Sequence, residues 1–486
     1  MRTLRVVLVG LMMACLAGCG TGSSPSADVD VIGSPEDPFE TGMRLSAAGQ
    51  LVRAATAEGL VGLDEQGRVI PALADRWIVT DDGLSYIFRL RDGSWPDGTP
   101  ISGESARAAL RHALSGLSGT SLALDFQPVD DVRAMAGRVL EIRLRRPAPD
   151  LLQLLAQPEL GLIRDGAGGG PMTLRRSGAV AELVSIPPGK LGLAQPDDWR
   201  AGQRSLAVRA LPAPAATDRF ADGKVDIVLG GRFADLPLAA AVSGLARRAL
   251  RIDPVPGLFG LAVVTGRGWL VAPECREAVA MAIDRDGIGP ALGLGTWAGT
   301  TAIVPPPGGG APAERWTDQT LGQRRADAAA RIRRCKARSG DPGPLRLALP
   351  PGPGSDALHD TLARDLATIG VGLARVPPSA AVDLRLVDTV ARYQRPEWYL
   401  HQLSCSVQRG PCNESAEALV MASEGEPDTG RRDALLAQAV AATTSANLFI
   451  PLGRPIRWSL VRERVDGFAP NAAAFHPLPP LARIGS

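Results

Sequence analysis

The sequence is poor in lysine, histidine and aromatic residues. Among its 486 residues there are four histidines, and aromatic side chains make up 4%. Only three of the 53 basic residues are lysines, at Lys190, Lys224 and Lys336, so the other fifty are arginines. A skew of this kind is typical of GC-rich coding, so a single arginine gives weak support for a binding site.

Neither sign of charge predominates. The 53 basic and 51 acidic residues are interspersed and leave a formal net charge of +2. This balance argues against nucleic-acid binding, which needs a dense basic surface, and against an acidic solvating tail. The hydrophobic content of 45% excludes a disordered chain, and the length predicts two or three folded domains.

Signatures of catalysis and of bound cofactors are missing. The sequence contains no Gly-x-Ser-x-Gly elbow, no Walker A loop and no His-Glu-x-x-His helix, so we expect neither an enzyme nor a cofactor. The glycine-rich stretch 166–171 ends in proline and lacks the context of a dinucleotide site. Metal binding is disfavoured because no histidine stands at ligand spacing with a cysteine. The four histidines are His112, His359, His401 and His476.

The N-terminal apolar run is too short to span a membrane. It covers residues 6–18, which is fewer than the roughly 20 residues that a membrane-spanning helix needs. Residues 1–18 are therefore predicted to be a signal peptide. The sequence Leu16-Ala17-Gly18-Cys19 resembles a bacterial lipobox, which implies acylation of Cys19, with palmitate among the acyl chains. The alternative is an ordinary signal peptide that is cut near an unrelated cysteine.

Cleavage before Cys19 would leave a mature chain that is attached to a membrane only through the lipid on Cys19. Residues 19–27 are predicted to form a flexible polar tether. We expect an exported protein, lipid-anchored to the cell membrane and facing the periplasm or the cell exterior. Two arginines leave with the signal peptide, so the mature chain has equal numbers of basic and acidic residues.

Four cysteines remain for disulfides once the signal peptide is removed and Cys19 is acylated. An exported protein meets an oxidising environment, in which thiols pair. Three pairings are possible, and the sequence alone does not choose among them. The short Arg-Gly-Pro turn favours a bond between Cys405 and Cys412, which leaves Cys275 and Cys335 as the second pair.

The spacing of apolar residues predicts a mixture of strands and helices, and hence an α/β fold. Alternation on both sides of an Asp-Asp-Gly turn predicts a β-hairpin over 77–90. Ser102 is placed to cap a helix that runs to about Leu117. Further strands are expected at 140–144, 225–229 and 257–263, and further helices at 149–155, from 273, at 324–337 and from Ser355 to Ile369.

Two glycine- and proline-rich segments, 166–171 and 305–310, are predicted to interrupt the regular structure. The first is expected to be the most flexible interior stretch and is a candidate domain boundary. Asp284 and Arg285 are expected to end the helix that begins at 273 through a local ion pair.

Several stretches, in order along the chain, resemble a known family. The first three contain the sequences VIPALADRW, DDGLSYIFRLRDG and WPDGTP at 69–77, 81–93 and 95–100. Matching segments follow at 222–227, 278–288 and 358–371. Over residues 45–486 the chain resembles the extracytoplasmic solute-binding proteins of ABC importers, in the peptide- and nickel-binding class called family 5.

The resemblance implies a two-lobed α/β fold of the type II periplasmic-binding-protein kind, with an extra subdomain inserted in lobe I. The solute would lie between the lobes, and closure would favour docking on the permease. The expected partners are a small-molecule or peptide solute and ABC permease subunits, and the expected state is a monomer. By order in the chain, lobe I comprises 28–63, 166–255 and 451–486, the inserted subdomain 64–165 and lobe II 256–450.

The segment 382–400 corresponds to one that contacts peptides in oligopeptide-binding relatives. There the family has a tryptophan and, three residues later, an aspartate that pairs with the α-ammonium of the peptide. Here these positions hold Thr389 and Arg392. A guanidinium repels an ammonium, so the hypothesis is that Arg392 binds an anionic or carboxylate-bearing solute. The alternative is one more exposed arginine among fifty.

Aromatic residues near this segment are further candidates for ligand contacts. Tyr393, Trp398 and Tyr399 lie within seven residues of Arg392 and would suit a flat or amphipathic solute. For Trp398, a place in the core is an equal alternative. Phe259, in the predicted strand 257–263, is a weaker candidate.

Two functions are compatible with these features. The first is a lipid-anchored receptor that delivers a peptide-like or other small solute to an ABC importer by cleft closure. The second is a non-transport envelope lipoprotein, such as a sensor, chaperone or assembly factor, on the same scaffold with a degenerate ligand site. The departures at Thr389 and Arg392 favour this alternative. So does Met172, which stands where the family has a tyrosine.

Overall fold

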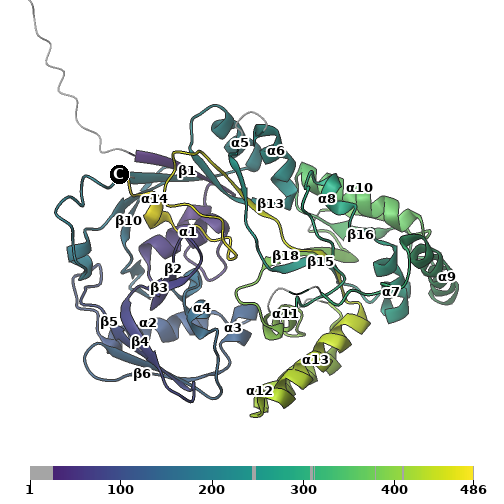
Figure 1. Ribbon diagram of the computed structural model, residues 1–486, viewed down its shortest axis with the longest axis horizontal. Helices are drawn as coiled ribbons and strands as arrows, with labels where there is room; N and C mark the ends of the chain where they lie inside the picture. Colours follow the sequence, from purple (N-terminus) through teal and green to yellow (C-terminus); the bar gives the residue numbers. More distant parts are fainter. Residues whose placement is uncertain are drawn as a thin grey trace, which may run out of the picture.

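The computed structural model describes residues 26–243, 248–306, 310, 312–377, 379–407 and 410–484. The predicted signal peptide, Cys19 and most of the predicted tether lie outside these ranges. The tether ends earlier than predicted, because Ser26 and Ala27 belong to a strand, β1 (Ser26–Ile32), and pair with its neighbour. The mixed α/β architecture that the sequence predicts is confirmed (Figure 1).

The first sheet has seven strands in the order β10-β11-β12-β1-β13-β20-β14. Strands β12, β1 and β13 run parallel, and the apolar residues Val29 and Val31 of β1 are buried. Helices α1 (Ala47–Thr56) and α5 (Ala213–Ala221) cover these central strands, as parallel strands require. The remaining strands are β10 (Met172–Ser177), β11 (Val180–Ser185), β12 (Ser205–Leu211), β13 (Ile227–Arg232), β14 (Leu250–Ile252) and β20 (Arg457–Val461).

The second sheet has five strands in the order β17-β16-β18-β15-β19. Its core includes the apolar faces of three helices, α7 (Pro273–Ala282), α9 (Leu321–Ser339) and α10 (Pro353–Ala367). The strands are β15 (Gly257–Val263), β16 (Leu345–Ala348), β17 (Leu373–Val376), β18 (Leu384–Val390) and β19 (Phe449–Gly453).

A smaller antiparallel sheet, β4-β5-β7-β6, lies beside the first sheet and contains the predicted hairpin. The hairpin is confirmed, with Gly83 at a φ of +67° in its turn. Helix α2 (Gly103–Gly116) also begins as predicted, because Ser102 and Ser105 form a reciprocal capping box. The strands are β4 (Ala74–Val79), β5 (Ser85–Leu90), β6 (Val129–Ala134) and β7 (Val139–Leu144).

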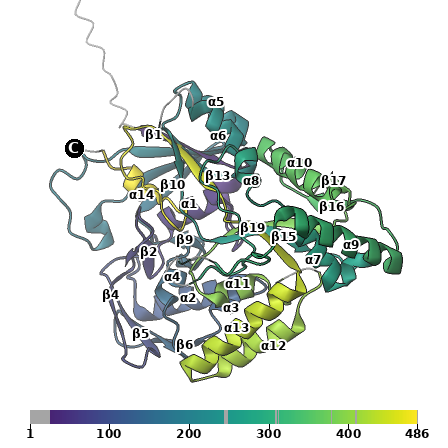
Figure 2. The same cartoon turned by 45° about the vertical axis from the view of Figure 1, so that its right-hand side comes forward.

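The chain passes between the two large sheets twice. It leaves the first sheet after β14 and enters the second at β15, and it returns between β19 and β20. The second sheet therefore extends to Gly453, beyond the expected boundary at 450. In both views the two sheets lie in separate bodies, with the smaller sheet beside α2 in a third (Figures 1 and 2).

No helix in the described ranges combines the length and the apolar character that crossing a membrane requires. The remaining elements of the described part of the chain are short, apart from helices α12 and α13. These elements are η1 (Asp37–Phe39), β2 (Val61–Leu63), β3 (Val69–Pro71), α3 (Ser121–Asp125), α4 (Leu151–Leu155), η2 (Pro158–Leu160), β8 (Ile163–Arg164), β9 (Ala167–Gly168), η3 (Pro188–Leu191), η4 (Phe233–Asp235), α6 (Leu236–Ser243), η5 (Gly268–Val271), α8 (Ile288–Ala291), α11 (Pro396–Gln402), α12 (Glu414–Gly425), α13 (Thr429–Ala446) and α14 (Leu478–Leu481).

Two local predictions on the second sheet's helices are wrong. Helix α10 begins at Pro353 rather than after Ser355, since proline loses no helical hydrogen bond in a first turn. Arg285 forms no ion pair with Asp284 in the described structure. Its buried guanidinium donates to the backbone carbonyls of Ala280 and Pro451, at 3.1 and 2.8 Å.

The segment 166–171 is not the loose stretch that its glycines suggest. It contains the β9 strand, and Gly170 is buried against the end of α1. A Cβ atom at Gly170 would lie 2.4 Å from the carbonyl carbon of Thr56, and one at Gly168 would lie 2.3 Å from the Cβ of Ala57. Gly168 and Gly170 therefore serve close backbone packing rather than flexibility.

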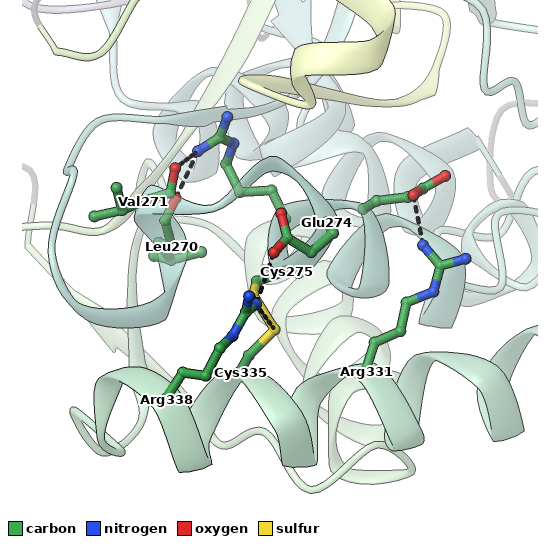
Figure 3. Close-up of a disulfide and its surroundings, with 9 residues drawn as sticks. Leu270, Val271, Glu274, Cys275, Arg331, Cys335 and Arg338 are labelled. Atoms are coloured by element: carbon green, nitrogen blue, oxygen red, sulfur yellow. Dashed lines mark hydrogen bonds and ion pairs between the residues drawn. A yellow bond between two sulfur atoms is a disulfide. The ribbon is translucent and has the colours of Figure 1, made fainter.

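Two disulfides are present, and they are the pairs favoured from the sequence. One joins Cys405 to Cys412, and the other joins Cys275 on α7 to Cys335 on α9 (Figure 3). Arg338 lies beside the second disulfide and forms an ion pair of 2.7 Å with Glu274. The disulfide between Cys275 and Cys335 fixes α7 and α9, two helices that pack on the second sheet, to each other.

Candidate functional site between the two sheets

The two large sheets enclose a cavity of about 950 Å³, called here the larger cavity. From the first sheet it is lined by the turn after β1 at 32–34, the start of α5 at 212–214 and the segment 232–235. From the second sheet it is lined by the segment between β16 and α10 at 348–353 and by most of β18 at 385–389. A cavity of this size between two bodies is a common form of ligand site.

A smaller cavity of about 270 Å³ adjoins it and is more polar. It reaches from the start of α1 to the C-terminal end of β18 and the residues that follow, including Arg392. Three residues line both cavities, namely Arg232, Asp388 and Thr389. The two cavities therefore meet at the middle of the same cleft.

A carboxylate shared by two arginines lies at this junction. Arg457 donates to Asp388 Oδ1 at 2.7 Å and to the Asp388 carbonyl at 3.1 Å, and both of these side chains are largely buried. Arg232 approaches Asp388 Oδ2 only to 4.0 Å, and 58% of its side chain is exposed. Asp388 therefore neutralises Arg457 more completely than it neutralises Arg232.

Arg392 lines the smaller cavity but already has an acidic partner. Its Nη2 lies 3.4 Å from Oε1 of Glu159, whose side chain is only 6% exposed. The second carboxylate oxygen of Glu159 is buried without a hydrogen-bond partner in the described structure. Arg53 is nearby, and burial lowers the pKa of Arg53 while the charge of Glu159 opposes that shift. Arg392 is thus one member of a charged group rather than an isolated cation.

The predicted aromatic contacts lie in the core instead of the cleft. Trp398 and Tyr399 are 0% exposed and pack edge to face, with ring centroids 4.9 Å apart. They share a hydrophobic cluster with the smaller sheet and α2. Phe259 is also buried, against Phe233 and Trp297, and it borders a separate cavity of about 400 Å³.

Tyr393 belongs to a buried polar cluster that joins the second sheet's body to the smaller sheet's body. Its hydroxyl donates to Asp125 Oδ1 at 2.8 Å, and His401 Nδ1 lies 2.7 Å from the same oxygen. Burial by itself lowers the pKa of His401, but hydrogen bonds to Asp125 and Glu424 outweigh it and raise that pKa to about 9. Burial and the charge of Asp125 raise the pKa of Tyr393.

Of the residues proposed from the sequence, the structure brings Thr389 and Arg392 to the cleft. Sequence reasoning missed Arg232, Asp388 and Arg457. Asp388 directly precedes Thr389 and lies within the segment 382–400, so its position in that segment could have identified it. The two arginines had no signal, because nothing in the sequence separates them from the other arginines. Within the described ranges, no three His, Cys, Asp or Glu side chains are grouped as a metal site requires.

Comparison with known protein families gives one match over most of the chain. The model of a family described as "Bacterial extracellular solute-binding proteins, family 5 Middle" matches residues 68–370, which is more than half of the sequence. This family consists of solute-binding proteins rather than enzymes.

Curated proteins match over shorter stretches. A probable deoxycholate-binding periplasmic protein of Escherichia coli (strain K12) is 34% identical over 129 residues, 21% of this chain and 23% of that protein. A glutathione-binding protein of the same strain is 28% identical over 167 residues, 33% of this chain and 31% of that protein. These alignments span about a quarter to a third of the relatives' length.

Solved structures share the fold over nearly the whole chain. The OppA protein of Haemophilus influenzae, in complex with the peptide RPPGFSPFR, has a TM-score of 0.78 at 16% identity and covers 95% of this chain and 99% of its own. The murein tripeptide binding protein of Escherichia coli also has a TM-score of 0.78, at 17% identity, covering 96% and 99%. The fold is the two-lobed α/β fold that the resemblance implied.

Proposed function

The chain belongs to the bacterial extracellular solute-binding proteins of family 5, and from this we propose that it is a receptor for a small, carboxylate-bearing solute. In the proposal, the solute binds in the cleft between the two large sheets, and closure of the cleft presents it to an ABC importer. A lipid on Cys19 holds the receptor at the cell membrane. Members of the family bind peptides or other solutes and work with ABC importers.

The observation that best supports this proposal is the pair of adjoining cavities in the cleft. Together they give a solute contacts with both bodies, through Gly33 and Ala213 on one side and through Leu386 and Thr389 on the other. A solute that contacts both bodies binds the closed form better than the open form, and this difference is what shifts the population on binding.

The division into lobes is part of the same proposal. The first sheet, from 28–63, 166–255 and 451–486, would form lobe I, and 64–165 would be its inserted subdomain. The segment 256–450 would form lobe II, with its boundary moved to Gly453 because β19 pairs with β15 up to that residue. The two crossings between the sheets would serve as the hinge.

Preference for a carboxylate follows from the charges around the smaller cavity. Arg232, Arg392 and Arg457 line it, and Asp388 is the one carboxylate among the described residues of its lining. Glu159 pairs with Arg392 and Asp235 acts on Arg232 from outside it. The lining itself therefore carries more positive than negative charge, which suits an anionic group and disfavours a free α-ammonium. Deoxycholate, named for one similar protein, is a carboxylate without an ammonium group, whereas glutathione, named for another, carries two carboxylates and one α-ammonium.

We place Arg392 and Thr389 at the solute and assign the buried aromatic residues to packing. Thr389 contributes a hydroxyl at the junction of the two cavities. Trp398, Tyr399 and Phe259 have almost no exposed surface with which to contact a solute. The hydroxyl of Tyr393 is engaged by Asp125.

The first test is to identify small molecules that co-purify with the native protein by mass spectrometry and to add the candidate back. At 100 times its dissociation constant, a true solute raises the free energy of unfolding by about 2.7 kcal/mol. Absence of any co-purifying or stabilising solute would instead favour a non-transport envelope lipoprotein.

The second test of this site is the Arg392→Ala variant. We expect it to weaken binding of the co-purified solute at least ten-fold in isothermal titration calorimetry. Arg111→Ala is the matched control, because Arg111 lies on α2 outside the cleft and is 58% exposed. Equal affinity of Arg392→Ala and the control would exclude Arg392 from the site.

A further inference from the structure

The walls of the larger cavity are mostly apolar and offer few hydrogen-bonding groups. They carry aliphatic side chains from both lobes, such as Ile32, Leu238, Leu349 and Leu386. Proline has no backbone N–H, so proline walls cannot pair with an extended peptide as a strand would. Five lining residues are prolines, namely Pro212, Pro214, Pro350, Pro351 and Pro353.

The charged groups of this cavity leave one cation poorly neutralised. The ion pair of Arg232 with Asp388 spans 4.0 Å, and it is the single ion pair of Arg232 in the described part of the chain. Asp388 is already held by Arg457 at 2.7 Å. Asp235 also lines the cavity but forms no ion pair with Arg232 in the described part of the chain; burial raises the pKa of Asp235, and the charge of Arg232 opposes that shift.

The surroundings of Arg232 favour an added anion. Although 58% of its side chain is exposed, the walls of the cleft and the charge of Arg457 lower the pKa of Arg232. An anion placed beside it would relieve both effects, because it supplies the negative charge that the cleft lacks. Arg232 lines both cavities, so an anion there would touch the mouth of the apolar one.

We propose that the solute is an amphipathic anion whose apolar body fills the larger cavity and whose anionic group pairs with Arg232. This inference rests on the proposed function, since it specifies the class of solute for the same cleft. It assigns specificity to a residue that lies on the first sheet, outside the segment 382–400. The apolar body accounts for the proline walls, and the anion accounts for the uncompensated guanidinium.

The alternative position for the anion is Arg385, which lines the larger cavity at the start of β18. Arg232 and Arg385 are both exposed, but Arg385 lines only the larger cavity and lies away from the junction. An anion gains more beside Arg232, because the walls of the cleft and the charge of Arg457 already disfavour an unpaired guanidinium there. This makes Arg385 a matched control, being the same residue type in the same cavity.

The proposal is tested with three probes that separate the apolar tail from the charge, measured by isothermal titration calorimetry on the full mature chain. Decanoate has both the tail and the charge, decan-1-ol has the tail alone, and acetate has the charge alone. We expect decanoate to bind most tightly, and its affinity to rise up to about four-fold for each CH₂ group added between hexanoate and decanoate. Equal affinity for hexanoate and decanoate would contradict an apolar binding site.

Two variants test which arginine pairs with the carboxylate of decanoate. Arg232→Gln should weaken decanoate binding at least ten-fold and leave decan-1-ol binding unchanged, which also shows that the cavity is intact. Arg385→Gln should change decanoate binding less than three-fold. The assignment is rejected if Arg385→Gln gives the larger loss or if both variants bind decanoate as the wild type does.

The co-purified solute separates this inference from the proposed function. If a native solute binds in the cleft but is uncharged or highly polar, the receptor function stands and the amphipathic-anion inference fails. If neither a native solute nor decanoate binds, the proposed function itself fails. A native solute that carries an apolar body and one anionic group, and that loses affinity in Arg232→Gln, supports both.

Discussion

Arg392 and Arg232 differ in the partners that the fold gives them, although both line the cleft. Glu159 lies 3.4 Å from Arg392 and comes from η2, far away in the sequence. Arg232 has only a carboxylate at 4.0 Å that another arginine already occupies. Residue type and local sequence do not distinguish such cases, because the charge that remains for a ligand depends on which carboxylates the tertiary structure brings near.

His401 carries a prediction about pH. Asp125 and Glu424 raise its pKa in the folded protein to about 9, above the ordinary 6.5. A raised pKa means that the folded state binds the proton more tightly, so this stabilisation is complete below about pH 6.5 and is lost as the pH rises through 9. The full effect is roughly 3 kcal/mol.

Urea unfolding of wild type and of His401→Gln between pH 6.5 and 9.5 checks this. The wild type should lose stability across the range, whereas His401→Gln should show a flatter profile and a lower stability at the acidic end. His112→Gln is the control, because His112 is exposed on α2. Parallel pH profiles for His401→Gln and wild type would disprove the contribution of His401.

At the scale of elements, capping and glycine placement explain where structure begins and ends. The cap of α2 was visible in the sequence as Ser102, and the structure adds Ser105, which completes a capping box with it. The role of Gly170 was not, since its neighbour Thr56 is distant in the sequence. A glycine that allows flexibility and one that allows close packing look the same in a sequence.

Gly170→Ala should therefore destabilise the protein by about 1–3 kcal/mol, the usual cost of overpacking. The new Cβ would lie 2.4 Å from the Thr56 carbonyl carbon, which is backbone and cannot move aside alone. Thermal and urea unfolding measure the change. Gly322→Ala is the control, because a Cβ there meets nothing within 4 Å, and it should be neutral or slightly stabilising. Equal stability of the two variants would show that this backbone approach is looser than the structure indicates.

At the scale of the whole molecule, polar contacts join the second sheet's body to the smaller body. Arg392 meets Glu159, and both Tyr393 and His401 meet Asp125. These contacts join the second sheet's body to residues 121–160 of the smaller body. A motion that separates these two bodies, as cleft opening in the proposed function would, breaks these contacts.

The double variant Glu159→Gln and Asp125→Asn should populate the open form. It removes the two carboxylates that hold the bodies together, so small-angle X-ray scattering without solute should show a larger radius of gyration than for wild type. The control is Glu36→Gln, which removes an exposed carboxylate paired with Arg176 within the first sheet's body. An unchanged radius, with folding verified by circular dichroism, would show that these contacts do not hold the closed form.

The sequence by itself determined the class of fold, the family, the hairpin and most helices, whereas it only favoured the two disulfide pairs that the structure shows. These depend on local periodicity, capping, turn residues and contiguous motifs, which are read within short segments. Thr389 and Arg392 were also found this way, because they lie in one continuous cleft segment.

Only the tertiary structure decided what those residues do. It buried Trp398 and Tyr399, paired Arg392 with Glu159, and left Arg232 facing an apolar cavity with little compensating charge. Burial and charge balance arise from segments that are far apart in the sequence. The physical reason is that a binding site depends on desolvation and on the sum of nearby charges, and both are properties of the packed chain rather than of any one segment.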